Sequence, residues 1–205
     1  LTLKRIGNRQ VSLVTVATGR LLGVSDIADK SVQSIYTFRD ELGPRGLGQL
    51  QGSASMVKQQ LLPSGAGERS ISANAVDWTK DDGWYLNLDV EPGSGERVTL
   101  DPEQQLGILR VIANVPDSAA CQPHAQAWVY HFDVFTGSHL PIAGTTVIAR
   151  RLDQQGLVSG VKTVWIDGRT TALLTDETGK ITTLPGAAAA ATGSSLRRVS
   201  WRELD

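Results

Sequence analysis

The stretch Asp81–Glu103, DDGWYLNLDVEPGSGERVTLDPE, decides the fold class. A glycine precedes a large indole, an alternating segment follows, and Pro-Gly-Ser-Gly marks a hairpin turn. Gly83 would allow the backbone to approach or turn closely beside the large indole of Trp84. Glu96 and Arg97 would begin a second strand, where alternation points them to opposite faces. We therefore expect no pair between them, and expect one to bond an exposed carbonyl or an opposite charge on a neighbouring sheet.

Composition describes a globular chain without a strong charge bias. The 205 residues carry a formal net charge of −1, with 40% hydrophobic and 20% charged residues. A basic surface for nucleic acid or anionic membrane is not indicated, and no apolar run reaches the length of a membrane span. The one cysteine, Cys121, excludes a disulfide within the chain.

Short β-branched or alternating segments separated by glycine-containing turns recur along the chain, which predicts an all-β fold. Arg69 shares a strand face with Ile71. The expected strands are Gln10–Thr18, Val32–Arg39, Glu68–Val76, Gly107–Val115, Ala127–Phe135, Thr145–Arg151, Val161–Ile166, Thr170–Thr175, Lys180–Leu184 and the closing LRRVSWRELD.

Two stretches depart from this pattern. Leu50, Ala54, Val57 and Leu61 recur at helical spacing, so a short helix is predicted near 49–61, although Gly52 weakens it. Residues 185–195, PGAAAAATGSS, are low in complexity and predict a flexible arm. These two regions, Arg45–Ser64 and Pro185–Ser195, are the expected binding loops.

Residues with catalytic or metal-binding chemistry are sparse. Cys121 and His124 lie three apart in a proline-containing loop with no orienting acid, so a nucleophile–base pair is not expected. The spacings of His124, His131 and His139 do not match compact zinc sites. No catalytic, cofactor-binding or metal-ligating residue is therefore assigned, and the chain is expected not to be an enzyme.

Two further groups have ordinary structural interpretations. Asp133 ends a strand before a turn, where its carboxylate would accept bonds from local amides, and TDETGK at 175–180 and RDELGP at 39–44 repeat that pattern. Small basic clusters predict a solvated surface, with an acidic partner as the alternative; they are Arg150 with Arg151, Arg197 with Arg198, and Arg202.

Four ordered patterns resemble the C-terminal β-propeller domain of the PilY/PilC family, the type IV pilus biogenesis factors and tip adhesins. They are TVATGRLLGVSD (15–26) with QSIYTFRD (33–40), GWYLNLDVEPGSGERV (83–98), VIANVPDSAACQPHAQAWVYHFDVFTG (111–137) and the terminal RRVSWREL. The resemblance implies a partial propeller of few blades, with 1–205 as one C-terminal portion of that domain. In such a propeller Trp84 would fill the gap between two blades. In this family Cys121 looks structural, either a buried thiol or a partner for an upstream cysteine.

The departures from the family pattern concern a glycine and calcium. The family's Gly-Thr-Gly reads Ala17-Thr18-Gly19 here. The family's calcium loop would lie upstream of Leu1, and no alternating-acid loop occurs in this chain. No cofactor is therefore expected in this stretch, and calcium is expected only in an upstream part of a longer protein.

By resemblance, the chain would serve pilus assembly, twitching motility and attachment. Its partners would be minor pilins, the pilus machinery and a host or abiotic surface receptor, and it would be exported to the pilus tip, cell surface or outer membrane. Two alternatives remain open: a quinoprotein-type propeller enzyme, and an exported structural repeat protein. We also expect the chain to be a fragment of a larger polypeptide, or to cover its sheet edges with another chain.

Overall fold

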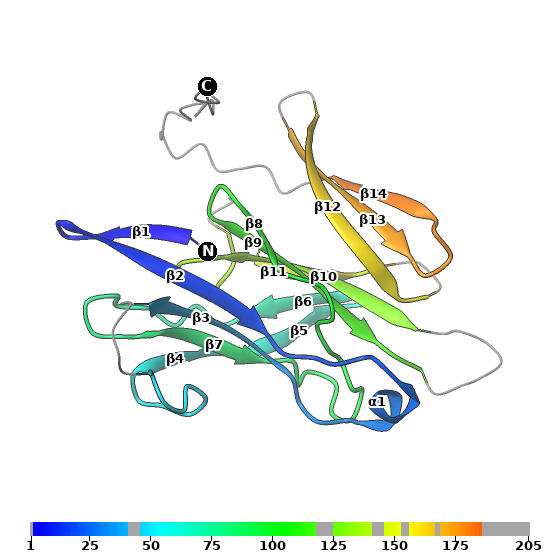
Figure 1. The fold of residues 1–205 in the computed structure, drawn as a ribbon, viewed down its shortest axis with the longest axis horizontal. Coiled ribbons are helices and arrows are strands. Elements are labelled where there is room, and N and C mark those ends of the chain that lie inside the picture. The colour runs from blue at the N-terminus through cyan, green and yellow to red at the C-terminus, as the bar shows by residue number, and fades with distance from the viewer. Residues whose placement is uncertain are drawn as a thin grey trace, which may run out of the picture.

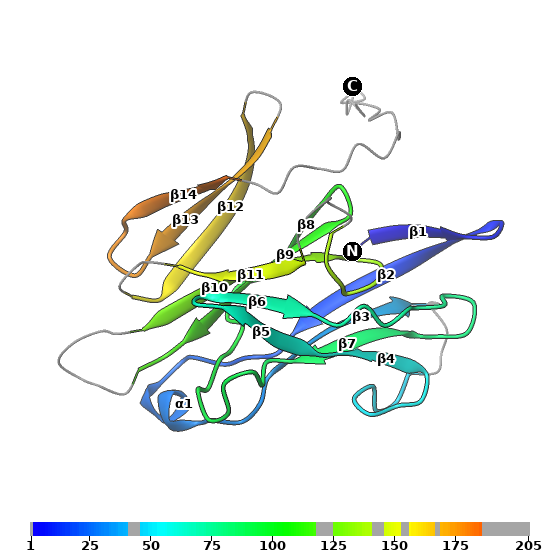
Figure 2. The same ribbon diagram turned by 180° about the vertical axis from the view of Figure 1, so that it is seen from behind.

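A computed structural model describes residues 2–40, 46–117, 125–140, 146–152, 156–166 and 169–185. They form three sheets of five, six and three strands, which do not close into a barrel (Figures 1 and 2). The all-β prediction is confirmed. Their strand counts differ from the four-stranded blades of a regular propeller, so the partial propeller stays a prediction.

The first sheet has the strand order β1-β2-β3-β7-β4 and the second β5-β6-β11-β10-β9-β8. Neighbouring strands are antiparallel except for β4 and β7. The first sheet comprises β1 (Thr2–Ile6), β2 (Arg9–Ala17), β3 (Ser34–Asp40), β7 (Gly83–Asn87) and β4 (Met56–Gln59). The second comprises β5 (Leu61–Gly65), β6 (Glu68–Ile71), β11 (Val147–Arg151), β10 (Gln126–Asp133), β9 (Ile108–Val115) and β8 (Glu103–Gln105). The third comprises β12 (Val158–Ile166), β13 (Arg169–Asp176) and β14 (Ile181–Pro185).

The second sheet is the middle layer, because both faces of β9 and β10 are buried. Trp128, Tyr130 and Phe132 face the first sheet in the larger core cluster. The intervening Ala127 and Val129 face the third sheet in a second cluster. A strand covered on both sides reads as a nearly continuous apolar run, which is why AWVYHF lacks a polar face. The third sheet accordingly lies beyond β9 and β10 from the first (Figures 1 and 2).

The predicted helix near 49–61 is wrong. Residues 56–59 form β4 beside β7, and 61–65 form β5 beside β6. Gly52, at φ 77°, lies in the turn before β4. The spacing of Val57 and Leu61 suits a helix, but each packs in the core from a different sheet. Tertiary pairing therefore overrides a weak local helical preference.

A short helix, α1 (Val24–Ala28), lies between β2 and β3. The side chain of Asp26 accepts bonds from the backbone N–H groups of Leu22 (2.8 Å) and Gly23 (3.2 Å) and thereby satisfies donors at the helix start. The described residues contain no helix long and apolar enough to cross a membrane.

The segment after Pro-Gly-Ser-Gly is not the full strand that was predicted. It makes an isolated antiparallel bridge, Arg97 to Asn114, because its remaining bonds go to loops. The predicted closing strand, residues 186–195 of the arm and most of the RDELGP turn lie outside the described residues.

Candidate functional site

Trp84 lies between the first and second sheets, as predicted. The side chain is fully buried, its indole N–H donates to the carbonyl of Val134 (2.9 Å), and its ring is 6.1 Å from that of Phe132. A Cβ on Gly83 would lie 2.1 Å from the Thr37 carbonyl oxygen, and one on Gly137 would lie 2.3 Å from the indole. GW and FTG, far apart in sequence, are therefore two sides of one contact.

The turn after β10 is stabilised by hydrogen bonds of its own Asp133 and by one from Trp78 in the loop before β7. Asp133 Oδ1 accepts from the backbone N–H groups of Phe135 (2.7 Å) and Thr136 (3.1 Å), as predicted. The indole of Trp78 donates to the carbonyl of Phe135 (2.9 Å). In the second predicted example, Asp176 accepts from the backbone N–H of Thr178 (2.9 Å).

Glu96 belongs to a buried charged cluster with Arg69 and Tyr130. Its carboxylate lies 2.7 Å from Arg69 Nη1 and accepts from the Tyr130 hydroxyl at 2.6 Å. The Arg69 guanidinium lies 3.6 Å from the centre of the Trp128 ring and also pairs with the exposed Glu91 (3.1 Å). Burial raises the pKa of Glu96, and Arg69 and the Tyr130 hydroxyl oppose that rise. A buried charge needs such partners to be tolerated.

Arg97 points elsewhere and holds the α1 loop. Its guanidinium donates to the carbonyls of Arg20 (2.8 Å), Asp26 (2.6 Å) and Asp29. Gly19 enters that loop beside Val98, where a Cβ would lie 2.4 Å from the Val98 carbonyl oxygen. The two predicted kinds of partner are both present: Arg97 bonds carbonyls, and Glu96 bonds an opposite charge, Arg69 on β6 of the second sheet.

The patterns that carry the family resemblance therefore meet in space. ATGRLLG contacts GER through Gly19 and Arg97, GER contacts the strand AWVYHFD through Glu96, and GWYL contacts DVFTG through Trp84. Each contact joins loops or sheets, and these side chains are buried. Their arrangement stabilises the stack of sheets and leaves no reactive group exposed among them.

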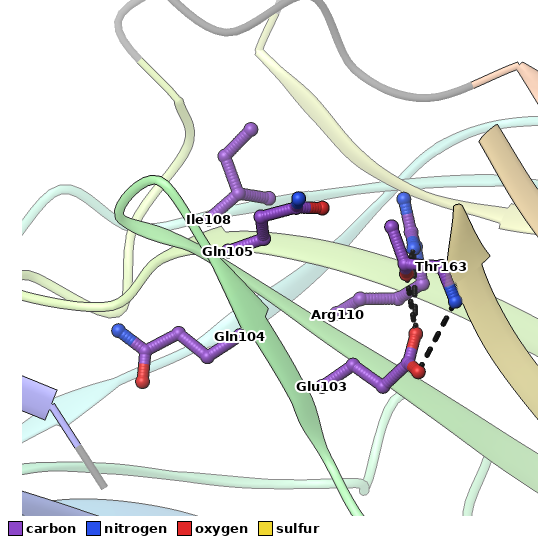
Figure 3. A pocket seen from close by; sticks show the side chains of 6 residues that line it. All are labelled: Glu103, Gln104, Gln105, Ile108, Arg110 and Thr163. Carbon is purple, nitrogen blue, oxygen red and sulfur yellow. Dashed lines mark hydrogen bonds and ion pairs between the residues drawn. The ribbon is translucent and has the colours of Figure 1, made fainter. Parts of the chain in front are cut away.

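A separate polar cavity of about 290 Å³ opens between the β8–β9 hairpin and β12 (Figure 3). Its lining residues are Glu103, Gln104, Gln105, Ile108, Arg110 and Thr163. Glu103 accepts from both the backbone N–H (3.2 Å) and the hydroxyl of Thr163, so it links the second sheet to the third. Gln105 and Glu103 reach toward Arg110 and Thr163, whereas Gln104 points the other way (Figure 3).

Arg110 forms the inner wall of this cavity. Its side chain is 6% exposed, its Nε donates to His131 Nε2 (3.1 Å), and its Nη1 donates to the Thr163 hydroxyl and lies 3.6 Å from Glu103. Burial, and then the nearby guanidinium, lower the pKa of His131 from 6.5 to about 4. His131 is therefore a neutral hydrogen-bond acceptor that orients the Arg110 side chain. This contact accounts for the buried position of His131 without a role in metal binding.

This pKa predicts an acid-sensitive stability. Between pH 6.5 and about 4, unfolded His131 binds a proton that folded His131 does not, so the free energy of unfolding falls as the pH falls through that window. The loss from this group should reach about 2–3 kcal/mol near pH 4. Urea unfolding at pH 7 and pH 4.5 should show a smaller loss for His131→Gln, whose amide oxygen can still accept from Arg110. An equal loss in both proteins would contradict this assignment.

The other expected candidates do not assemble into a site. His139 Nδ1 lies 3.2 Å from the hydroxyl of Ser138, and among the described residues no three His, Cys, Asp or Glu side chains form a metal cluster. Arg150 and Arg151 are exposed, and Arg150 pairs with Glu68 at 3.3 Å. Five candidates lie outside the described residues: Cys121, His124, Arg197, Arg198 and Arg202.

Sequence reasoning missed the cavity and the partner of Glu96. An arginine on the apolar face of a strand was the available signal for Arg69, because such a side chain must find a buried acid. Arg110 within GILRVIANV gave the same signal. Glu103 and Thr163, sixty residues apart, gave no local signal, because only the stacking of sheets brings them together.

Comparison with known proteins gives one distant similarity. A type IV pilus biogenesis factor PilY1 homolog from Xylella fastidiosa is 24% identical over 128 residues. The match covers 61% of this chain but 9% of that protein, so this chain corresponds to a small part of its relative. No family model and no solved structure matches the chain. The similarity indicates a distant PilY1-like relationship over part of the chain.

Proposed function

We propose that this chain is part of a non-enzymatic protein of type IV pilus assembly and tip adhesion. The similarity to the PilY1 homolog carries the proposal. On this view the protein is exported to the pilus tip, cell surface or outer membrane, where it acts with minor pilins and the pilus machinery. A receptor on a host or abiotic surface would be its adhesion partner.

The packing of the sheets supports a binding role in place of catalysis. Two charged residues in the patterns of the family resemblance, Glu96 and Arg97, make contacts that hold sheets and loops together. A rigid β framework that presents loops suits binding. A quinoprotein-type activity is the alternative, and a cofactor absorbance spectrum of the purified protein would reveal it.

Deletion of the encoding region in the source organism is expected to reduce surface pili, twitching and attachment. Electron microscopy counts pili, and twitching zones and adherence to a plastic surface measure function. Complementation with the wild-type region should restore all three, as should Gln60→Ala, which changes an exposed side chain outside the cavity. Unchanged piliation, twitching and adherence after deletion would contradict the proposal.

A further inference from the structure

The β8–β9 hairpin at the cavity has a strained turn. Gln105 pairs with Ile108, which leaves Leu106 and Gly107 as its two central residues, at φ 53° and 80°. Such turns favour Asn-Gly, because a branched side chain is disfavoured at positive φ. Among the described residues, Leu106 is the one non-glycine residue in this region of φ. Its side chain is 41% exposed, so core packing does not compensate for the strain.

Both neighbours of this turn line the polar cavity, so the strained leucine stands at its edge. Strain in a sparsely populated backbone region is retained where surrounding structure enforces it, and it gathers at ligand sites. The exposed aliphatic side chain of Leu106 could make an apolar contact with a ligand bound in the cavity. Ile108, which lines the cavity, supplies another.

The polar lining is balanced in charge and in hydrogen bonding. It contains one carboxylate (Glu103) and one guanidinium (Arg110). An anionic ligand would be repelled by Glu103, and a cationic ligand would be repelled by Arg110. Within the described ranges Nη2 of Arg110 makes no hydrogen bond, because its neighbours use Nε and Nη1. The exposed amide of Gln105 both donates and accepts. A neutral ligand whose neighbouring hydroxyl groups both donate and accept hydrogen bonds is therefore complementary to Arg110 Nη2 and the Gln105 amide.

We propose that this cavity binds a neutral saccharide unit, with Gln105 and Arg110 Nη2 bonding its hydroxyls and Ile108 and Leu106 contacting its C–H face. The cavity volume of about 290 Å³ has room for a single sugar ring. A peptide segment exchanges the same hydrogen bonds, but a recess of this size holds only a residue or two of it.

Ligand-observed NMR on the full 205-residue chain tests the proposal. The probes are glucose, galactose, mannose, N-acetylglucosamine and N-acetylgalactosamine, with methyl phosphate and an amidated alanyl-leucine dipeptide as other ligand classes. At least one neutral sugar should show saturation transfer, and the phosphate and dipeptide should not. Absence of transfer to every sugar, or transfer to phosphate or dipeptide alone, would overturn the assignment.

Two variants and a control locate the binding. Gln105→Ala should weaken sugar binding by about fivefold, the loss expected for one hydrogen bond, while Gln60→Ala should leave it unchanged. Leu106→Gly should raise Tm by about 2–4 °C by removing the strain, yet weaken binding. Sugar binding that Gln105→Ala leaves unaltered would place the sugar elsewhere and refute the site.

The outcome is separable from that of the pilus proposal. Sugar binding is measured on purified protein, whereas pilus assembly is measured by deletion in cells. Normal sugar binding with unchanged piliation would contradict only the assembly role, and loss of pili without sugar binding would contradict only the cavity assignment.

Discussion

Glu96→Ala is expected to lower the free energy of unfolding by about 3–5 kcal/mol, because it leaves a buried guanidinium without its main counter-charge. Both side chains of the pair are essentially inaccessible, at 1% for Arg69 and 0% for Glu96. The substitution also removes the acceptor of the Tyr130 hydroxyl. Urea unfolding near pH 7 measures the loss.

The same arginine supplies a matched control. Glu91 pairs with Arg69 at a similar distance, 3.1 Å, but its side chain is 52% exposed. Glu91→Ala should therefore cost less than about 1 kcal/mol, since exposed ion pairs contribute little. A double variant, Arg69→Met with Glu96→Leu, should recover much of the loss because no unpaired charge remains. Equal losses for Glu91→Ala and Glu96→Ala would show that burial does not govern this cluster.

The sequence was sufficient for the parts of the fold that depend on local pattern. Alternation and β-branched residues located β2, β3, β9 and β10 to within two or three residues. Gly83 predicted a close backbone approach, because glycine has no side chain. The packing of Trp84 between sheets was predicted from the family resemblance. Asp133 was predictable for the same reason, since its partners lie within three residues.

Long-range pairing accounts for most of what could not be predicted. The stretch 49–61 carries a weak helical periodicity, and only its neighbours β7 and β6 make 56–65 extended. β8 is three residues long and gains its identity from pairing with β9. The cavity depends on how the third sheet lies on the second, which no local pattern specifies.

The short patterns that resemble pilus proteins contain the residues that contact one another in the structure. GTG-like, GER, GW and FTG patterns are weak signals when taken singly, because each is short. Their contacts explain why they occur as a set: Arg97 needs the carbonyls of the α1 loop, and Trp84 needs the glycine at 137. This set of residues holds sheets and loops together, so our proposal assigns ligand binding to other residues, those lining the polar cavity.

Trp84→Ala should lower the free energy of unfolding by about 3–5 kcal/mol, the usual cost of removing a large buried aromatic side chain. The indole is fully buried between two sheets, and its loss also leaves the Val134 carbonyl without its donor. Trp84→Phe should cost less, since it keeps most of the packed volume. A thermal melt compares the variants, and a transition barely shifted by Trp84→Ala would show that the two sheets do not depend on this contact.

Gly137 allows a sharper form of this test. A methyl group at 137 would lie 2.3 Å from the indole, and the backbone there has φ 66°. Gly137→Ala therefore combines a clash with backbone strain in the wild-type protein. In the Trp84→Ala background the clash is gone, and only strain of about 1–2 kcal/mol remains. The double variant should thus lose less stability than the sum of the single losses, whereas strictly additive losses would mean that the glycine and the tryptophan do not share one contact.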